Sequence, residues 1–213
     1  MTEGTAAKQY WKGGNMLYPL PAVLVSCGRF AGENNILTLA WAGTVCSDPP
    51  MVSVSIRPER YSYGIIRESG EFVINLTTCS LARAADLCGV RSGRDINKWE
   101  ACSLHPGEGK AVEAPLILES PVNLECRVSQ VLELGSHHMF LAMVEGVWVD
   151  ERLLDQKGRL HLEKADLMAY SHGEYISLGK KLGQFGFSVR RREKTGTVRA
   201  GRASEKGGRK GRS

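Results

Sequence analysis

The chain has 213 residues, of which 42% are hydrophobic and 24% are charged, and its formal net charge is +5. These values are ordinary for a soluble globular domain. A membrane-spanning helix is not expected, because no apolar run in the sequence approaches the roughly 20 residues that such a helix needs. The first residues also lack the basic and apolar regions of a signal peptide. We therefore expect a cytoplasmic protein that makes no membrane contact.

The positive charge is concentrated in residues 190–213, which contain ten Lys or Arg and two Glu and therefore carry a net charge of +8. Since the whole chain carries +5, the remaining residues carry a net charge of −3. This segment is rich in Gly and Ser and nearly free of apolar residues, so we expect a basic, disordered tail. A solubilising extension is favoured over an electrostatic contact with nucleic acid or an acidic partner. No aromatic residue is interleaved among the charges for base stacking.

The sequence predicts about seven strands, at residues 22–27, 36–41, 51–56, 72–76, 121–134, 138–149 and 175–178. The third alternates cleanly, with apolar side chains on one face and serines on the other. Two short helices are expected, one over 61–68 that ends at Gly70, and one that Ser80 caps and Gly89 stops. Residues 89–110 form a long polar loop in this interpretation. The pattern indicates a mainly β, antiparallel barrel or sandwich with a few short helices.

The two longest predicted strands differ in their polarity. Strand 121–134 alternates between apolar and polar residues, and Gln130 is the single break on its apolar side. Strand 138–149 is apolar on both faces except at Glu145 and Gly146. One of its faces is therefore expected to pack in the core and the other against a partner such as a second subunit.

Several catalytic and metal-binding signatures are missing. The chain has no Gly-x-Gly-x-x-Gly dinucleotide motif, phosphate loop or Gly-x-Ser-x-Gly elbow. His137 and His138 are adjacent on a strand edge, so their side chains diverge, and we expect no metal site. The six cysteines form no Cys-x-x-Cys pair, and we expect them to be reduced and partly buried.

Residues 34–63 carry the groups best suited to a ligand. They read as a strand, a polar loop, Pro49-Pro50, a second strand and an arginine-rich turn into a helix. Arg57 and Arg60 could both reach one phosphate, and Ser62 lies at the start of a helix whose free N–H groups favour an anion. A solvated loop with its arginines in surface ion pairs explains the residues equally well.

The same region resembles the flavin-reductase-like family, and most closely its flavoredoxin branch. The resemblance rests on Asn35-x-x-Thr38-x-x-Trp41 and on segments 47–50, 55–62, 71–76, 93–99, 120–126 and 182–186. It implies an FMN-binding, antiparallel, Greek-key-like split β-barrel over residues 15–189, with an N-terminal extension at 1–14 and the basic tail at 190–213. It also implies a homodimer with one FMN per subunit.

The resemblance further implies which residues hold FMN. The flavin ring and ribityl chain would lie along Thr38, Ala40, Trp41, Ala42, Gly43, Thr44 and Ser47. The phosphate would be held by Arg57, Arg60 and Ser62. Ser55 and Tyr63 belong to the same set. The cavity would be closed by Asn75 and by the 91–99 loop with Arg94, Lys98 and Trp99, from the same or from the neighbouring subunit. His137 or His138 would lie near the exposed flavin face, while Trp41 is explained equally well as a core residue.

The activity that follows is NAD(P)H-dependent flavin reduction through bound FMN, with NAD(P)H as a transient donor that needs no Rossmann domain. The alternative is a flavoredoxin-type electron carrier that passes electrons between redox protein partners without nicotinamide turnover of its own. A third, weaker hypothesis gives the tail a nucleic-acid contact. Deleting residues 190–213 would then abolish salt-sensitive binding.

Overall fold

The computed structural model describes residues 6–189. They divide into a main unit that ends at Gly179 and a second unit that begins at Lys180. The described part of the second unit contains one 3₁₀ turn, Phe187–Val189. The basic segment 190–213 lies outside the described residues, so the predictions about the tail remain predictions.

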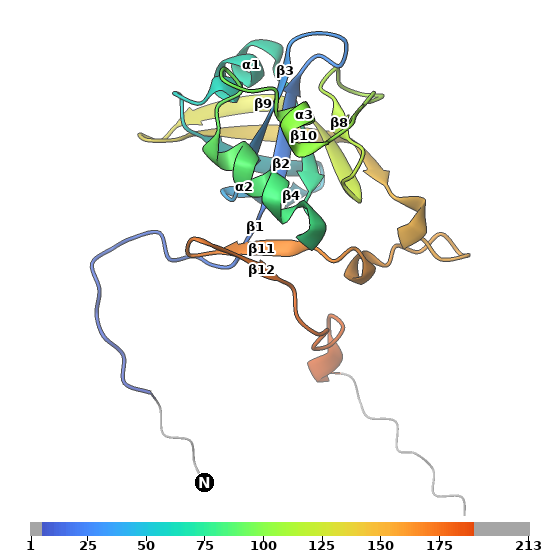
Figure 1. Ribbon diagram of the computed structural model, residues 1–213. Coiled ribbons are helices and arrows are strands. Elements are labelled where there is room, and N and C mark those ends of the chain that lie inside the picture. The colour runs from blue at the N-terminus through green and yellow to red at the C-terminus, as the bar shows by residue number, and fades with distance from the viewer. Residues whose placement is uncertain (1–5, 190–213) are drawn as a thin grey trace, which may run out of the picture. The chain divides into compact units, whose positions relative to one another are not determined.

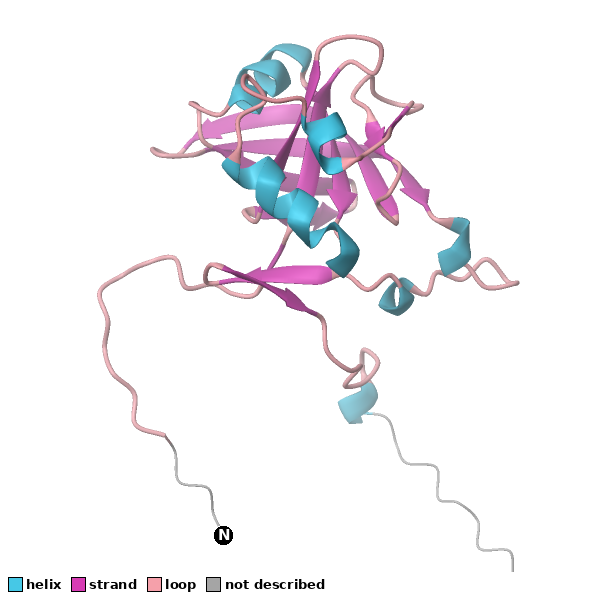
Figure 2. Cartoon of the chain, in the orientation of Figure 1, coloured by secondary structure: helices cyan, strands magenta, loops and turns pink. Residues whose placement is uncertain are grey.

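A seven-stranded antiparallel sheet dominates the main unit (Figures 1 and 2). Its spatial order is β3-β2-β6-β9-β10-β5-β4. The strands are β2 (Val23–Gly28), β3 (Asn34–Leu39), β4 (Ala42–Ser47), β5 (Pro50–Ile56), β6 (Glu71–Leu76), β9 (Val122–Glu133) and β10 (His138–Val149). The expectation of a mainly β, antiparallel fold is therefore confirmed.

The connection between β3 and β4 explains why this sheet rolls up. These strands lie at opposite edges of the sheet, yet only Ala40 and Trp41 separate them in the chain. Three residue steps span about 11 Å at most, so the two edges must come close together. The Ser55 backbone N–H donates to the Trp41 carbonyl at 2.9 Å, which fixes the connection against β5.

Within residues 6–179, two small sheets and three helices accompany the main sheet. β1 (Leu20–Pro21), β11 (Met168–Ser171) and β12 (Glu174–Ser177) form one sheet, and β7 (Pro106–Gly107) pairs with β8 (Leu116–Ile117). The helices are α1 (Tyr61–Ser69), α2 (Ala82–Val90) and α3 (Lys98–Cys102), with 3₁₀ turns at Cys79–Leu81, Glu151–Leu153 and Leu162–Lys164. Figure 2 shows α2 and α3 lying across one face of the main sheet.

Strand β2 is buried along its whole length because it separates two hydrophobic clusters. Val23, Val25 and Cys27 pack inside the barrel with residues such as Phe72 and Phe140. Leu24, from an alternate position of β2, and Ala22, which immediately precedes the strand, pack against α2 through a second cluster. Side chains alternate across a strand, so one strand supplies both cores. The barrel wall that faces α2 is thereby held rigidly.

Two sequence-based predictions about segment type were wrong. Residues 42–47, expected as a polar loop, form the edge strand β4, which pairs with β5. Most of its residues are exposed, so no apolar alternation marks it. Residues 89–110, expected as a loop, contain α3, whose N-terminus is capped by Asn97 through a bond from the Trp99 N–H.

The boundaries of α2 also differ from the prediction. Ser80 lies in the preceding 3₁₀ turn, and Gly89 lies inside the helix, which continues to Val90. A Cβ at Gly89 would lie 3.3 Å from Cβ of Thr38. This glycine therefore permits close packing of the helix on β3 and does not end the helix.

The break at Gln130 is the sign of a β-bulge. Gln130 is paired with Leu141, but the next pair along the ladder is Val128 with Ala142, so Ser129 is the extra residue. Beyond the bulge Val131 packs against the core in place of the residue that simple alternation predicts.

No helix within residues 6–189 is long and apolar enough to cross a membrane. All six cysteines are free, and three of them are buried, as predicted.

Candidate functional site

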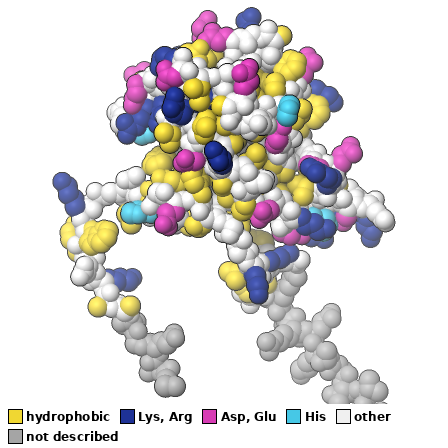
Figure 3. All heavy atoms as spheres, in the orientation of Figure 1, with side chains coloured by type: hydrophobic (Ala, Val, Ile, Leu, Met, Phe, Trp, Pro, Cys, Tyr) yellow, Lys and Arg dark blue, Asp and Glu magenta, His cyan; other side chains and the backbone are white. Residues whose placement is uncertain are grey.

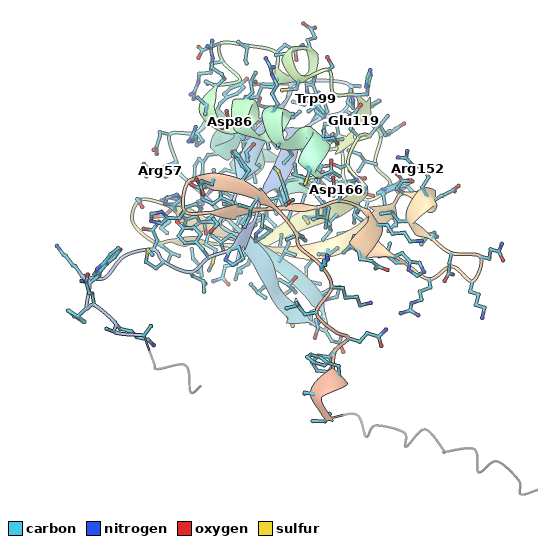
Figure 4. The ribbon with its side chains drawn as sticks, turned by 60° about the horizontal axis from the view of Figure 1, so that its bottom comes forward. Arg57, Asp86, Trp99, Glu119, Arg152 and Asp166 are labelled. Carbon is cyan, nitrogen blue, oxygen red and sulfur yellow. The ribbon has the colours of Figure 1, made fainter. Side chains whose placement is uncertain are left out.

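A cavity of about 960 Å³ lies where the two edges of the sheet meet α1 and α2. Its volume is at the upper end of the range typical of small-molecule sites. The wall comes from β3 and the 40–41 connection, the turn after β5, the start of α1, the end of α2 and the loop 91–94. Figure 4 labels two residues of this lining, Arg57 from the turn and Asp86 from α2.

The cavity lining is strongly cationic. It contains five cationic side chains and two carboxylates, namely Arg57, Arg60, Arg91, Arg94, Lys98, Glu59 and Asp86. On the face drawn in Figure 3, by contrast, side chains of both signs are mixed. Arg57 forms an exposed ion pair with Glu59 at 3.4 Å. Within residues 6–189, Arg60, Arg91 and Arg94 form no ion pair, so no carboxylate neutralises their charges. The Arg60 guanidinium donates to the Gly89 carbonyl at 3.1 Å, and the Arg94 guanidinium lies 5.1 Å from the centre of the Tyr61 ring.

The N-terminus of α1 opens onto the same cavity. Its N-cap residue, Arg60, makes no side-chain capping bond, and the first turn contains no acidic residue. Tyr61 and Ser62 line the cavity. Ser62 is buried and accepts a 2.8 Å hydrogen bond from the Asn35 amide, which fixes this end of the helix. An uncapped helix N-terminus between arginines is an anion-binding arrangement.

Lys98 is a buried cation in the cavity wall, with 4% of its surface exposed. Its ammonium group donates to the Ile36 carbonyl at 2.7 Å and to the Cys88 carbonyl at 2.8 Å. Burial lowers the pKa of Lys98. A lysine has three N–H donors, so one remains for a ligand.

An aromatic group forms another part of the wall. The Trp41 and His137 rings are stacked, with centroids 6.1 Å apart and an interplanar angle of 10°, and the Tyr170 ring lies 6.4 Å from Trp41. Burial, with a contribution from the nearby Arg57 charge, lowers the pKa of His137. The imidazole is therefore mainly neutral at pH 7. Because the wall consists of stacked rings, it suits a flat aromatic ligand.

Thr38 and Ser55 line the cavity, as does Ala40. The Thr38 hydroxyl, however, donates to the Ala85 carbonyl at 2.5 Å. This hydrogen bond connects β3 to α2 and uses the hydroxyl proton, so the Thr38 hydroxyl can act toward a ligand only as an acceptor.

Other residues of the predicted set lie elsewhere. Ala42, Gly43 and Thr44 line a second, smaller cavity of about 390 Å³ together with Trp41. The main cavity includes none of these three, nor Ser47, because β4 runs along β5 and carries them away from α1. The Tyr63 hydroxyl and His138 Nδ1 are hydrogen-bonded to each other at 2.9 Å, and neither residue lines the main cavity.

Asn75 and Trp99 do not line the main cavity of the same chain. The Asn75 side chain is fully buried, donates to the Leu24 carbonyl and accepts from the Ile117 N–H and the Asn123 amide. Trp99 packs in the cluster under α2, and its indole N–H donates to Asn34 at 2.7 Å. Both residues therefore have structural roles in this chain. A sequence motif alone does not show whether its residues stabilise the fold or bind a ligand.

We expect Asn75→Ala to destabilise the protein by about 2–3 kcal/mol, because it leaves several buried polar groups without partners. Because this side chain does not line the main cavity, the folded variant should bind added FMN, the ligand that the sequence resemblance implies, as the wild type does. Chemical unfolding and flavin titration of the same preparation measure the two quantities. Weakened flavin binding at unchanged stability would contradict the structural role.

Sequence reasoning missed several lining residues. They are Asn15, Asn35, Asp86, Gly89, Tyr170 and Tyr175. Arg91 and Ser92 also line the cavity and belong to the 91–99 loop that was expected there. Tyr170 lies on β11, a strand of four residues that the apolar pattern did not reveal.

Fold and site together define an antiparallel barrel whose cationic, aromatic-walled cavity fits a phosphorylated aromatic molecule. Within residues 6–189, no group of three or more metal-ligating side chains is present. The model of the flavin reductase like domain matches residues 15–179. The chain therefore belongs to this family and has its split-barrel fold.

Sequence and structural similarity to individual proteins supports this family assignment. An uncharacterized protein of Archaeoglobus fulgidus is 35% identical over 141 residues, which cover 66% of this chain and 78% of that protein. The flavoredoxin of Desulfovibrio vulgaris (Miyazaki F) superposes with a TM-score of 0.79 at 31% identity, covering 86% of this chain and 100% of that one. A flavoredoxin from Methanosarcina acetivorans gives 0.77 at 27% identity, with coverage of 86% and 100%.

Proposed function

We propose that the main cavity binds FMN and that the protein catalyses NAD(P)H-dependent flavin reduction through it. The observation that carries the proposal is the placing of arginines and an uncapped helix N-terminus beside a stacked aromatic wall. The first group of features fits a phosphate and the second fits a flat ring. Membership of the flavin reductase-like family supports the same ligand.

The lining residues divide between the two ends of FMN. Arg57, Arg60 and the first turn of α1 hold the phosphate, with Lys98 as a further donor. Residues 38–41 and His137 bound the ring. Bound FMN supplies the hydride and electron chemistry, and the protein supplies orientation and electrostatics. Neutral His137 brings no second charge to the ring, while the cations fix the phosphate and so set the ring's position.

Steady-state oxidation of NADH and of NADPH by the FMN-loaded protein, with added FMN or FAD as acceptor, tests the activity. We expect turnover with at least one nicotinamide, and its loss when the flavin is removed. Absence of turnover with either nicotinamide, in protein that retains flavin, would contradict the reductase assignment and leave the cavity assignment standing.

The alternative function is that of an electron carrier. It is supported by the flavoredoxins among the similar structures, one of them 31% identical over the whole of its length. Stopped-flow reduction of the bound flavin separates the two functions. A carrier would be reduced slowly by NADH and NADPH but fast by a reduced ferredoxin, whereas a reductase would be reduced fast by one of the nicotinamides.

We also propose that the protein is a homodimer that uses the outer face of β10. Met139, Leu141 and Met143 alternate along that face and remain half-buried in a single chain. Leu141→Lys should convert a dimer to a monomer in light scattering after size exclusion, with Leu134→Lys, at an exposed turn, as the control. A monomeric wild-type protein would contradict this proposal.

A further inference from the structure

Helices α2 and α3 bring two cysteines into contact beside the cavity. Sγ of Cys88 lies 3.8 Å from Sγ of Cys102, although 14 positions separate them in the chain. Cys88 is buried and lines the cavity, whereas Cys102 is only half-buried. No other pair among the six cysteines has a sulfur–sulfur contact in the described part of the chain, which includes all six.

The packing around these cysteines holds the two thiols together. Both side chains belong to the hydrophobic cluster beneath α2. The Lys98 ammonium at the start of α3 donates to the Cys88 carbonyl at 2.8 Å, which ties the helices together. A disulfide bond is about 2.05 Å long, so the sulfurs need to approach by less than about 2 Å. Rotation of the side chains supplies such a movement without separating the helices.

We propose that Cys88 and Cys102 form a redox modification site at which a peroxide produces an intramolecular disulfide. The Cys102 sulfur loses its proton and attacks the peroxide oxygen, which oxidises it to sulfenic acid. When the peroxide is hydrogen peroxide, the departing hydroxide takes up that proton and leaves as water. The Cys88 sulfur then attacks the sulfenic sulfur, forms the S–S bond and expels a second water.

The order of these steps follows from the surroundings of each thiol. Cys102 is the accessible partner, so the oxidant reaches it first. Burial raises the pKa of Cys88 to about 12, so this thiol stays protonated and reacts second, giving its proton to the hydroxyl that leaves the sulfenic sulfur. Cys46, which hydrogen-bonds to the Asp48 carbonyl and has no thiol neighbour, provides a comparison within the same chain.

The disulfide would constrain the cavity wall. It would close the loop 89–101, which includes Arg91, Arg94 and the donor Lys98. Reduction would release this loop. The pair therefore couples the oxidation state of the surroundings to the freedom of the cationic segment.

Peptide mapping tests this site directly, because trypsin places each of the six cysteines in a separate peptide. The full-length protein is treated with hydrogen peroxide, blocked with N-ethylmaleimide and digested without reductant. We expect peptides 84–91 and 99–110 to become joined, and dithiothreitol to separate them. Cys46→Ser should give the same product, whereas Cys88→Ser should accumulate sulfenic or sulfinic acid at Cys102.

Thermal unfolding supplies a second readout. The oxidised protein should melt about 5 °C or more above the reduced protein, and native trypsin cleavage at Arg91 and Arg94 should slow. Sulfinic acid at Cys102 without joined peptides in the wild type would overturn the proposal. Joining of other cysteines in preference to this pair would also overturn it. None of these measurements requires bound flavin.

Discussion

Alanine at Arg57 or at Arg60 is expected to weaken FMN binding about 10- to 150-fold. Each guanidinium would contribute a charge-assisted bond to the phosphate worth about 1.5–3 kcal/mol. Both side chains line the cavity beside the uncapped end of α1. Titration of each apo-variant with FMN, followed by flavin fluorescence, measures the dissociation constant.

Arg83→Ala is the matched control, because Arg83 is an exposed arginine on α2 that does not line the cavity. It should bind FMN like the wild type. The Arg60 guanidinium also donates to the Gly89 carbonyl at 3.1 Å, so unfolding of the Arg60 variant should be measured alongside. Wild-type affinity in both Arg57 and Arg60 variants would show that the phosphate lies elsewhere.

Glu125→Gln is expected to destabilise the protein by about 3 kcal/mol, lowering Tm by roughly 6–12 °C. Glu125 is 1% exposed. Its carboxylate accepts hydrogen bonds from the backbone N–H groups of residues 110, 111 and 112 and from the Trp148 indole N–H. The shortest donor–oxygen distance for each of these four donors lies between 2.6 and 3.0 Å. This carboxylate fastens the 110–112 loop to β9, and glutamine presents an N–H₂ group to donors that need an acceptor.

The same variant should change the pH dependence of stability. Burial raises the pKa of Glu125, but the N–H donors outweigh burial and hold the pKa below its ordinary value. A depressed folded-state pKa gives stability that is present above the unfolded-state pKa, about 4.3, and is lost as pH falls through the folded-state value.

The difference in unfolding free energy between wild type and Glu125→Gln should therefore narrow on acidification below about pH 4. Urea unfolding at a series of pH values measures it. Glu108→Gln, at a neighbouring residue outside these bonds, is the control. A difference that stays constant down to pH 2 would contradict the role assigned to the carboxylate.

The strands were predictable where burial imposes a pattern. β5 alternates because only one face meets the core, and the Gly135 turn separates the two long strands. β4 escaped prediction because an exposed edge strand needs no apolar face. α3 escaped because five residues carry too little periodicity, although Asn97 gave a capping signal.

The site was predictable where its residues are contiguous. Arg57, Arg60 and Ser62 lie in one turn and reach one cavity. Asn75 shows the limit of such reasoning, since its amide is surrounded by groups from strands and loops far apart in sequence. Tyr170 shows the converse, because a distant strand brings it to the cavity. Long-range packing decides both positions, and no local pattern encodes it.

The most direct test of the flavin assignment is the visible absorption spectrum of the full-length protein after incubation with excess FMN and desalting. The cavity described here predicts a retained flavin spectrum near one FMN per chain, and its loss in Arg57→Ala/Arg60→Ala. Desalted wild-type protein without flavin absorbance, and without flavin binding in an equilibrium titration, would contradict the assignment of this cavity to FMN.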